Sequence, residues 1–352
     1  MRELLFLLAA AAVLNAQPEM KYPGGIVHPQ PQETLPFDVR LSLTGRVMLD
    51  DRQVPPEPVP VEFSCHGDNR AALTDTKGKF TIPITTQRAA KTDVITTPLK
   101  LEGCQVQIRI PGFEELIVPL TEPHRASDLM LGDLTLKAAA HTGGAEFSET
   151  ARSAPPKARA SYVRGVELVN SAQYADALAA LDKALAAFPN FASALQLKGV
   201  VLERTGKLGA AREAYQQAAA ADPSYSKPLV QLAQMAADDQ NAAETARWAA
   251  MANKLAPGAY PGMYLLEGSS YFDLNRYDDA GKAAQAGIDA DPKFVYPSLR
   301  KLMGEVLYQK RNYAGALELF EWYLKAAPEA TDIDGVQERV QSCKRLVKTA
   351  AR

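Results

Sequence analysis

The residues of this chain best suited to chemistry are its cysteines and histidines. Cys65 and Cys104 each fall on the apolar parity of an alternating segment, so both side chains should point inward. In an oxidising compartment this predicts a disulfide between them. Two unpaired thiols remain an alternative, and so does a zinc site completed by His66 and His124, although that spacing matches no usual zinc pattern. Cys343, in a later helical segment, is interpreted as a packed thiol rather than a dimer bridge.

Signatures of catalysis are missing from the sequence. None of the patterns GxSxG, HExxH, GxxxxGK and GxGxxG occurs. Paired carboxylates such as Asp238 and Asp239 are adjacent, so they cannot face each other on a helix. The histidines all fall in predicted loops or linkers: His28, His66, His124 and His141. We therefore expect no enzyme activity, no catalytic or metal-binding residue and no cofactor.

Charge and the N-terminus bear on the compartment. The 352 residues carry a formal net charge of −2, which leaves no basic surplus for nucleic acid or anionic lipid. Residues 1–16 resemble a secretory signal peptide, with an apolar run over residues 4–14 and cleavage expected after Ala16. That run is shorter than the roughly 20 residues that span a bilayer. We expect an exported protein, periplasmic or extracellular, with no membrane span.

A helical pattern recurs through the second half of the chain. In the segment QYADALAALDKALAAFPN, residues 173–190, apolar residues and alanines form one stripe at helical spacing, and a proline ends the helix. Four further copies end at prolines, and the successive separations are 34, 34, 35 and 36 residues. A glycine stands 24 residues before four of the five closing prolines, which predicts close helix crossings: Gly165, Gly199, Gly268 and Gly304.

This period, with two helices per unit, resembles the tetratricopeptide repeat family. The resemblance covers residues 158–330 and implies a right-handed α-solenoid of five two-helix repeats. Their expected bounds are 158–191, 192–225, 226–260, 261–296 and 297–330. Residues 331–352 hold a more polar segment that we interpret as a capping helix, because the end of a solenoid needs a polar outer face.

Residues 38–137 change to a period of two, which predicts short strands in a β-sandwich. The turn TDTKGKF should place Asp75 against nearby backbone N–H groups and Gly78 at positive φ. Together with TGRV, IPGFEE and LGDLTLK, it resembles the carboxypeptidase regulatory-like domain, a transthyretin-like sandwich. The resemblance implies seven to eight strands in a Greek-key-like order and a non-catalytic module. A Pro-rich leader at 17–37 and a flexible linker at 138–157 are expected on either side.

The fold class is therefore a multidomain chain, a β-sandwich followed by an all-α solenoid. In the repeat family, ligands often meet positions two, five, nine and twelve of each unit. Carried onto this sequence, the resemblance implies a groove for another protein, as an extended peptide or a helix. The predicted partner row is Tyr162, Val166, Gln196, Val200, Lys227, Val230, Gln234, Leu265, Ser269, Phe272, Lys301, Glu305 and Tyr308.

Other interpretations of the same residues stay open. The groove can be solvated and without a specific ligand. Tyr174, Tyr277 and Tyr313 recur at the start of each second helix, where core packing is the expected role. Carbohydrate or cell-envelope binding through loops 66–70 and 123–128 of the sandwich is the alternative function, with the repeats as a spacer. We expect a monomer that binds no nucleic acid.

Overall fold

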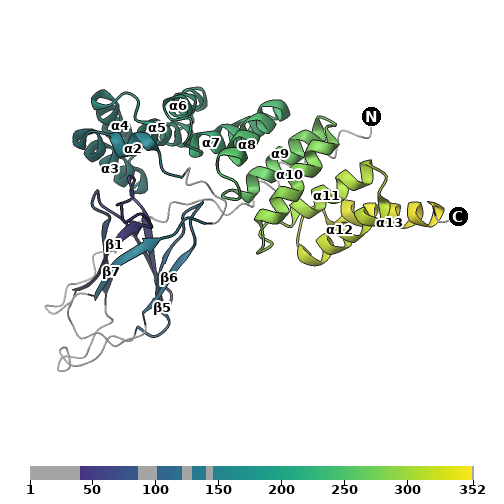
Figure 1. The fold of residues 1–352 in the computed structure, drawn as a ribbon, viewed down its shortest axis with the longest axis horizontal. Helices are drawn as coiled ribbons and strands as arrows, with labels where there is room; N and C mark the ends of the chain where they lie inside the picture. Colours follow the sequence, from purple (N-terminus) through teal and green to yellow (C-terminus); the bar gives the residue numbers. More distant parts are fainter. Residues whose placement is uncertain (1–39, 86–100, 121–128, 140–145, 351–352) are drawn as a thin grey trace. The chain divides into compact units, whose positions relative to one another are not determined.

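The computed structural model describes residues 40–85, 101–120, 129–139 and 146–350. The predicted signal peptide, the Pro-rich leader and the loop at 123–128 lie outside these residues. Within them the chain forms seven strands followed by twelve helices, labelled α2 to α13 (Figure 1). None of the described helices has both the length and the apolar character needed to cross a membrane.

The strands form two sheets. The three-stranded sheet has the order β4-β1-β7, with β1 (Arg40–Leu49) antiparallel to β4 (Lys79–Thr85) and parallel to β7 (Leu129–Leu136). The four-stranded sheet has the order β3-β2-β5-β6, all antiparallel, and its strands are β3 (Asp68–Leu73), β2 (Pro60–Cys65), β5 (Cys104–Ile108) and β6 (Leu116–Leu120). Alternate residues of both sheets share one hydrophobic core, including Val47, Phe63, Ile82, Val106 and Leu136.

Strand β3 was not predicted. His66 and Gly67 form a tight turn at positive φ, 45° and 88°, and β3 pairs back onto β2 directly after it. The sequence DNRAAL has no β-branched residue and most of its side chains are half-buried, so it lacked the alternation that marked the other strands. The loop predicted at 66–70 is therefore a two-residue turn and the start of a strand.

The predicted turn before β4 is confirmed. Asp75 Oδ1 accepts hydrogen bonds from the backbone N–H groups of Lys77 and Lys79 at 2.8 and 2.9 Å. Gly78 has a φ of 72°, and a Cβ at this position would meet the carbonyl oxygen of Val47. Both the positive φ and the close approach of backbone require glycine here.

The helices after residue 155 follow one another as five consecutive pairs. These pairs are α3 (Pro156–Asn170) with α4 (Tyr174–Ala187), α5 (Ala192–Arg204) with α6 (Leu208–Ala221), α7 (Lys227–Asp238) with α8 (Ala242–Leu255), α9 (Pro261–Asp273) with α10 (Tyr277–Ala290), and α11 (Ser298–Gln309) with α12 (Tyr313–Ala326). The last helix, α13 (Ile333–Ala350), packs on α12. Close crossings at the predicted glycines are confirmed: a Cβ on Gly304 would lie 2.9 Å from the ring of Phe320.

Part of the predicted linker is ordered. Residues 149–153 form a short helix, α2 (Glu149–Ser153), and α3 begins at Pro156. Phe147 is buried in the core of the sheets, whereas Ala151 and Ala154 are buried in the core of the first helix pairs. Small and polar composition suggested a flexible segment, but its few apolar side chains are divided between two cores and fix its path.

Contacts divide the described residues into two compact units. The N-terminal unit contains both sheets, α2 and the first two helix pairs, up to residue 225. The C-terminal unit contains the other three helix pairs and α13, from residue 226 onward. The first two helix pairs thus group with the sheets rather than with the later pairs, which the sequence did not indicate.

Candidate partner-binding face

In the N-terminal unit, the predicted partner row is mostly buried. Tyr162 on α3 is 6% exposed, and its ring packs on Phe191 with 5.0 Å between centroids. Val166 and Gln196 are 7% and 5% exposed. Val200 alone of these four is half-buried. The first helix pairs therefore offer a partner less surface along this row than the repeat positions predicted, because Tyr162 and Val166 belong to the core of the helices.

In the C-terminal unit, the row is more accessible. Helices α7 and α9 contact each other, as do α9 and α11, so the first helices of successive pairs are neighbours. Val230 is buried, but the other predicted residues of α7 and α9 are half-buried: Lys227, Gln234, Leu265, Ser269 and Phe272. Within the described part of the chain, neither the Gln234 amide nor the Ser269 hydroxyl has a hydrogen-bond partner. They provide donors and acceptors between apolar side chains.

The aromatic residues of the row pack within their own repeats. Phe272 lies 5.2 Å from Tyr277, and Tyr308 lies 5.4 Å from Tyr313, both edge to face and measured between ring centroids. Such pairs fix the turn from the first helix to the second. The predicted packing role of Tyr277 and Tyr313 is therefore confirmed, and half-buried Tyr174 packs against the core of the first helices.

At α11 the residues of the row already contact α13 and the residue that precedes it. Lys301 Nζ donates a hydrogen bond to Asp332, and Arg339 pairs with Glu305, with 3.2 Å between Nε and Oε2. The hydroxyl oxygens of Tyr308 and Ser342 are 3.0 Å apart, and the Arg339 guanidinium lies 4.7 Å from the Tyr308 ring centroid.

These contacts also shift the ionisation of the groups involved. Burial by itself would raise the pKa of Asp332, but the hydrogen bond and charge of Lys301 and the bond from Tyr323 hold it below the usual value. Burial raises the pKa of Glu305, against the opposing charge of Arg339. Glu305 is thus a largely buried carboxylate beside Arg339, and its Oε2 has no hydrogen-bond partner among the described residues.

The contacts of α13 show which residues the sequence reasoning missed. Glu305 and Arg339 are 34 residues apart, and so are Tyr308 and Ser342. Helix α13 therefore takes the place of the first helix of a further repeat, and Arg339 and Ser342 continue the row. Extending the 34-residue period past residue 330 would have identified both.

The sheets and the first helix pairs are joined by buried carboxylates. Glu57, 5% exposed, accepts hydrogen bonds from the Ser148 N–H at 3.0 Å and from the Ser193 hydroxyl at 2.7 Å. Asp222, 4% exposed, accepts from the Ser148 hydroxyl at 2.6 Å and from the Glu149 N–H at 2.7 Å. We call Glu57, Ser148, Glu149, Ser193 and Asp222 the joint.

Ionisation of Asp222 is coupled to the joint. Burial by itself would raise the pKa of Asp222, but the hydrogen bonds from Ser148 and Ser224 outweigh it and lower the pKa. A lowered pKa means that the folded state stabilises the carboxylate. This contribution is present above the unfolded pKa and is lost as the pH falls through the folded pKa.

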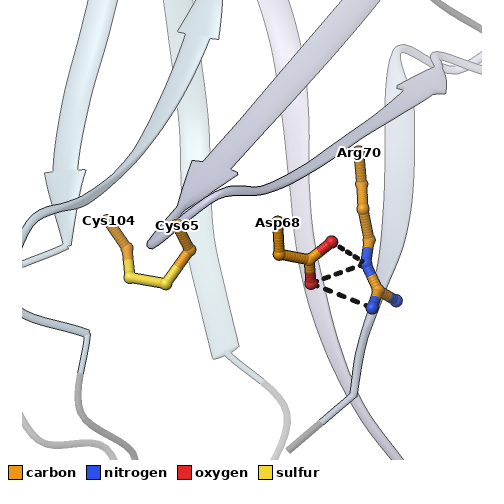
Figure 2. The surroundings of a disulfide bond; sticks show 4 residues. All are labelled: Cys65, Asp68, Arg70 and Cys104. Atoms are coloured by element: carbon orange, nitrogen blue, oxygen red, sulfur yellow. Dashed lines mark hydrogen bonds and ion pairs between the residues drawn. A yellow bond between two sulfur atoms is a disulfide. The ribbon is translucent and has the colours of Figure 1, made fainter.

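The structure contains the predicted disulfide between Cys65 and Cys104 (Figure 2). The pairing of β2 with β5 places the two residues directly opposite each other at the end of one sheet, with 4.2 Å between their Cα atoms. Beside it, Arg70 pairs with Asp68 at 2.9 Å from Nη2 to Oδ2 (Figure 2). The two unpaired thiols considered from the sequence are thus not the form seen.

The disulfide argues against the alternative zinc site. Ligand atoms of Cys65, His66 and Cys104 lie within 4.8 Å of one another. The sulfurs are bonded to each other, whereas zinc binds thiolates. His124 lies outside the described residues. Cys343, a residue of α13, is buried in the core that α12 and α13 share, and this burial raises the pKa of its thiol, which fits the predicted packed thiol.

Comparison with known proteins identifies the repeats. The family described as "Tetratricopeptide repeat" matches residues 162–226 and 265–331, so the chain contains tetratricopeptide repeats, as predicted. No curated protein matches the chain. The resemblance of residues 38–137 to a carboxypeptidase regulatory-like domain stays a prediction.

Several solved structures are similar to about half of this chain. YrrB, a tetratricopeptide repeat protein with an unusual peptide-binding site, has a TM-score of 0.45 at 17% identity over 51% of this chain and 90% of its own. A tetratricopeptide repeat protein from Parabacteroides merdae has a TM-score of 0.44 at 17% identity, covering 56% of this chain and 76% of its own. PilF of Pseudomonas aeruginosa has 0.39 at 17%, covering 55% and 91%. Similarities of this size support no inference about a ligand.

Proposed function

We propose that this protein is an exported, non-enzymatic scaffold that binds another protein through the concave groove of its helical repeats. In this proposal, five repeats form a right-handed solenoid, and the two sheets form a Greek-key-like sandwich of the carboxypeptidase regulatory-like type. Tetratricopeptide repeats are interaction scaffolds as a class, which supports the general role. The groove, the partner and export go beyond that class.

The groove is supported most directly by polar side chains on α7 and α9 that have no hydrogen-bond partner among the described residues. Gln234 and Ser269 are half-buried and have no hydrogen-bond partner among the described residues, and they lie on neighbouring helices with the apolar Leu265 beside them in the row. An amide and a hydroxyl can bond to a peptide backbone in any sequence, whereas Leu265 and Phe272 can contact its side chains. This arrangement suits an extended peptide or one face of a partner helix.

The test uses the full mature chain with a photocrosslinking residue in place of Ser269. Irradiation in the envelope fraction of the native host should yield one dominant adduct. The same residue in place of Lys282, an exposed position on α10, serves as the control. Adduct formation at both sites alike, or at neither, would contradict binding at the row.

A pair of matched variants then tests the surface itself. Leu265→Arg places a bulky charge in the row, whereas Leu274→Arg places the same charge at the exposed end of α9. We expect Leu265→Arg to abolish the adduct or lower it about tenfold or more, because an unpaired charge in an interface is costly. Leu274→Arg should leave it unchanged. Equal effects of the two variants would remove the row as the binding site.

Export is tested separately. We expect the protein from the native host in the envelope or the medium, with an N-terminus that follows Ala16. N-terminal sequencing of the purified protein measures this directly. A chain that keeps residues 1–16 and fractionates with the cytoplasm would contradict export without bearing on the row.

A further inference from the structure

A pocket of about 320 Å³ lies within the N-terminal unit, between the sheets and the first helices. Its walls come from the segment before β2 (residues 53–58), the turn at 75–76, Arg152 of α2, and Arg159, Tyr162 and Val163 of α3. Tyr162 belongs both to this pocket and to the predicted partner row. The pocket therefore lies at the end of the row that α3 contributes.

The pocket is held in shape by contacts of its own walls. Glu57 faces it from the Pro-rich segment and is fixed by Ser148 and Ser193 of the joint. On its rim, Arg152 Nη1 donates a hydrogen bond to Gln53 Oε1 at 2.9 Å. Because these elements are far apart in sequence and bonded to each other, the pocket is formed before any ligand arrives, which lowers the entropic cost of binding.

Among the charged side chains that line the pocket, Arg159 is the one without a partner in the described part of the chain. Glu57 is taken up by the joint, and Asp75 Oδ1 bonds the turn amides of Lys77 and Lys79. Arg159 is half-buried, and among the described residues its side chain has neither an ion pair nor a hydrogen bond. A guanidinium presents several N–H donors in a fork that matches a carboxylate. The rest of the lining is largely apolar, with Pro55, Pro56, Pro58, Val163 and the ring of Tyr162.

We propose that this pocket binds a carboxylate carried by a peptide segment of the partner, with Arg159 as the principal contact. An apolar side chain beside that carboxylate lies against the prolines and Val163. The inference rests on the proposed function and deepens it, because it places one end of the bound segment at α3 and assigns a carboxylate to that end. A peptide is favoured over a small acid because the apolar lining gives room for a side chain next to the carboxylate.

The test compares two fluorescent libraries of random octapeptides that end in leucine, one with a free C-terminal carboxylate and one amidated. Fluorescence anisotropy with the full mature chain should show that the free acids bind about ten- to a hundredfold more tightly, as expected for hydrogen bonds to a charged group. Arg159→Ala should abolish this difference. Arg164→Ala, on the same helix with an exposed ion pair to Glu167, should keep it.

Other outcomes would contradict the proposal or assign the pocket to a different ligand. If the acid and amide libraries bind equally, or if Arg159→Ala and Arg164→Ala behave alike, the proposal is wrong. Competition by propionate at the same concentration as the free-acid peptides would assign the pocket to a small carboxylic acid and overturn the peptide. Thr76→Trp fills part of the pocket while leaving Arg159 in the sequence, and it should also weaken binding of the free acids; unchanged binding would place the carboxylate elsewhere.

Failure here and failure of the groove are distinguishable. If Leu265→Arg removes the photocrosslinked adduct whereas Arg159→Ala and the amidated library have no effect, the groove stands and the pocket inference falls. If Arg159→Ala weakens binding of the free acids but no adduct forms at Ser269, the pocket binds a carboxylate and no partner is bound at the row on α7 and α9.

Discussion

The two ends of the helix pairs are closed in different ways. At the C-terminal end, α13 repeats the contacts of a first helix, 34 residues after α11, and pairs Arg339 with Glu305. At the N-terminal end, no repeat is added. Instead Glu57 accepts hydrogen bonds from Ser148 and Ser193, which are 91 and 136 residues further along the chain. One closure extends a periodic pattern, and the other brings unrelated segments together.

This difference has an energetic side. The C-terminal contacts join charges of opposite sign that keep some contact with water, with Arg339 40% exposed and Glu305 21%. Such pairs contribute modestly and tolerate substitution. The joint holds buried carboxylates whose donors are neutral N–H and O–H groups, and breaking such a contact leaves polar groups buried without partners. We therefore expect the N-terminal end to respond more strongly to single substitutions.

Reduction of the disulfide should have the largest effect. It closes a loop with a sequence separation of 39, and its loss should lower the free energy of unfolding by about 2–4 kcal/mol. Because the sheets form one unit with the first two helix pairs, the transition that moves should include both. Calorimetry with and without a reducing agent measures the shift, and hydrogen exchange assigns it.

The C-terminal unit is the internal control for that experiment. Cys343, its buried thiol, forms no disulfide, so its transition should not respond to reductant. Exchange that accelerates in β2 and β5 but not in α3 to α6 would show that the sheets unfold independently of the helices and would refute the joint as an energetic coupling.

Glu57→Ala should have the next largest effect. The variant leaves the Ser148 N–H and the Ser193 hydroxyl buried without an acceptor, which costs about 2 kcal/mol. Its local signature is faster hydrogen exchange in α2 and at the start of α5. Glu62→Ala, at a half-buried position on β2, is the matched control and should leave α2 protected. If both variants loosen α2 equally, the joint does not depend on Glu57.

Asp332→Ala should have a smaller effect. It removes the acceptor for Lys301 and for the Tyr323 hydroxyl, whose distance to Asp332 Oδ1 is 2.8 Å, and we expect a loss of about 1–2 kcal/mol. The start of α13 should fray, visible as faster exchange over residues 333–340. Asp334→Ala, in the same turn but exposed, should cost less than half as much. Equal losses would mean that Asp332 acts only through the helix dipole.

The elements that sequence reasoning predicted are those with a local period. The closing prolines located the ends of α4, α6, α8, α10 and α12, and alternation located β2, β4, β5 and β6. The cysteines were paired correctly because both sit on the inward parity of their strands. In each case the pattern lies within one segment, and it can be recognised without information about neighbouring segments.

What the sequence did not reveal depends on contacts between distant segments. Glu57 stands among prolines and resembles a solvated loop residue, yet it is buried against Ser193. Tyr162 was predicted to lie on an open face, but it is buried in the core of the first helices. A periodic pattern assigns a residue to a face of its helix and says nothing of which other segment covers that face.

Glu267→Gln is the smallest predicted effect and has the opposite sign. Asn253, 5% exposed, donates to Glu267 Oε2 at 2.7 Å, while its own Oδ1 has no partner among the described residues. Burial raises the pKa of Glu267, although the bond from Asn253 opposes this. A glutamine can accept the same bond and donate one back to Asn253 Oδ1, which should stabilise the C-terminal unit by about 1 kcal/mol at neutral pH.

The pH dependence separates this mechanism from simple loss of charge at the surface. A raised folded pKa means that the protonated carboxyl stabilises the fold at low pH, and that this contribution is lost as the pH rises from the unfolded pKa through the folded one. The wild-type chain and the glutamine variant should therefore be nearly equal in stability near pH 4 and diverge above it. Glu318→Gln, at an exposed site on α12, is the control and should track the wild type at every pH. A constant difference between Glu267→Gln and the wild type from pH 4 to pH 8 would show that burial of the charge at Glu267 is not the cause.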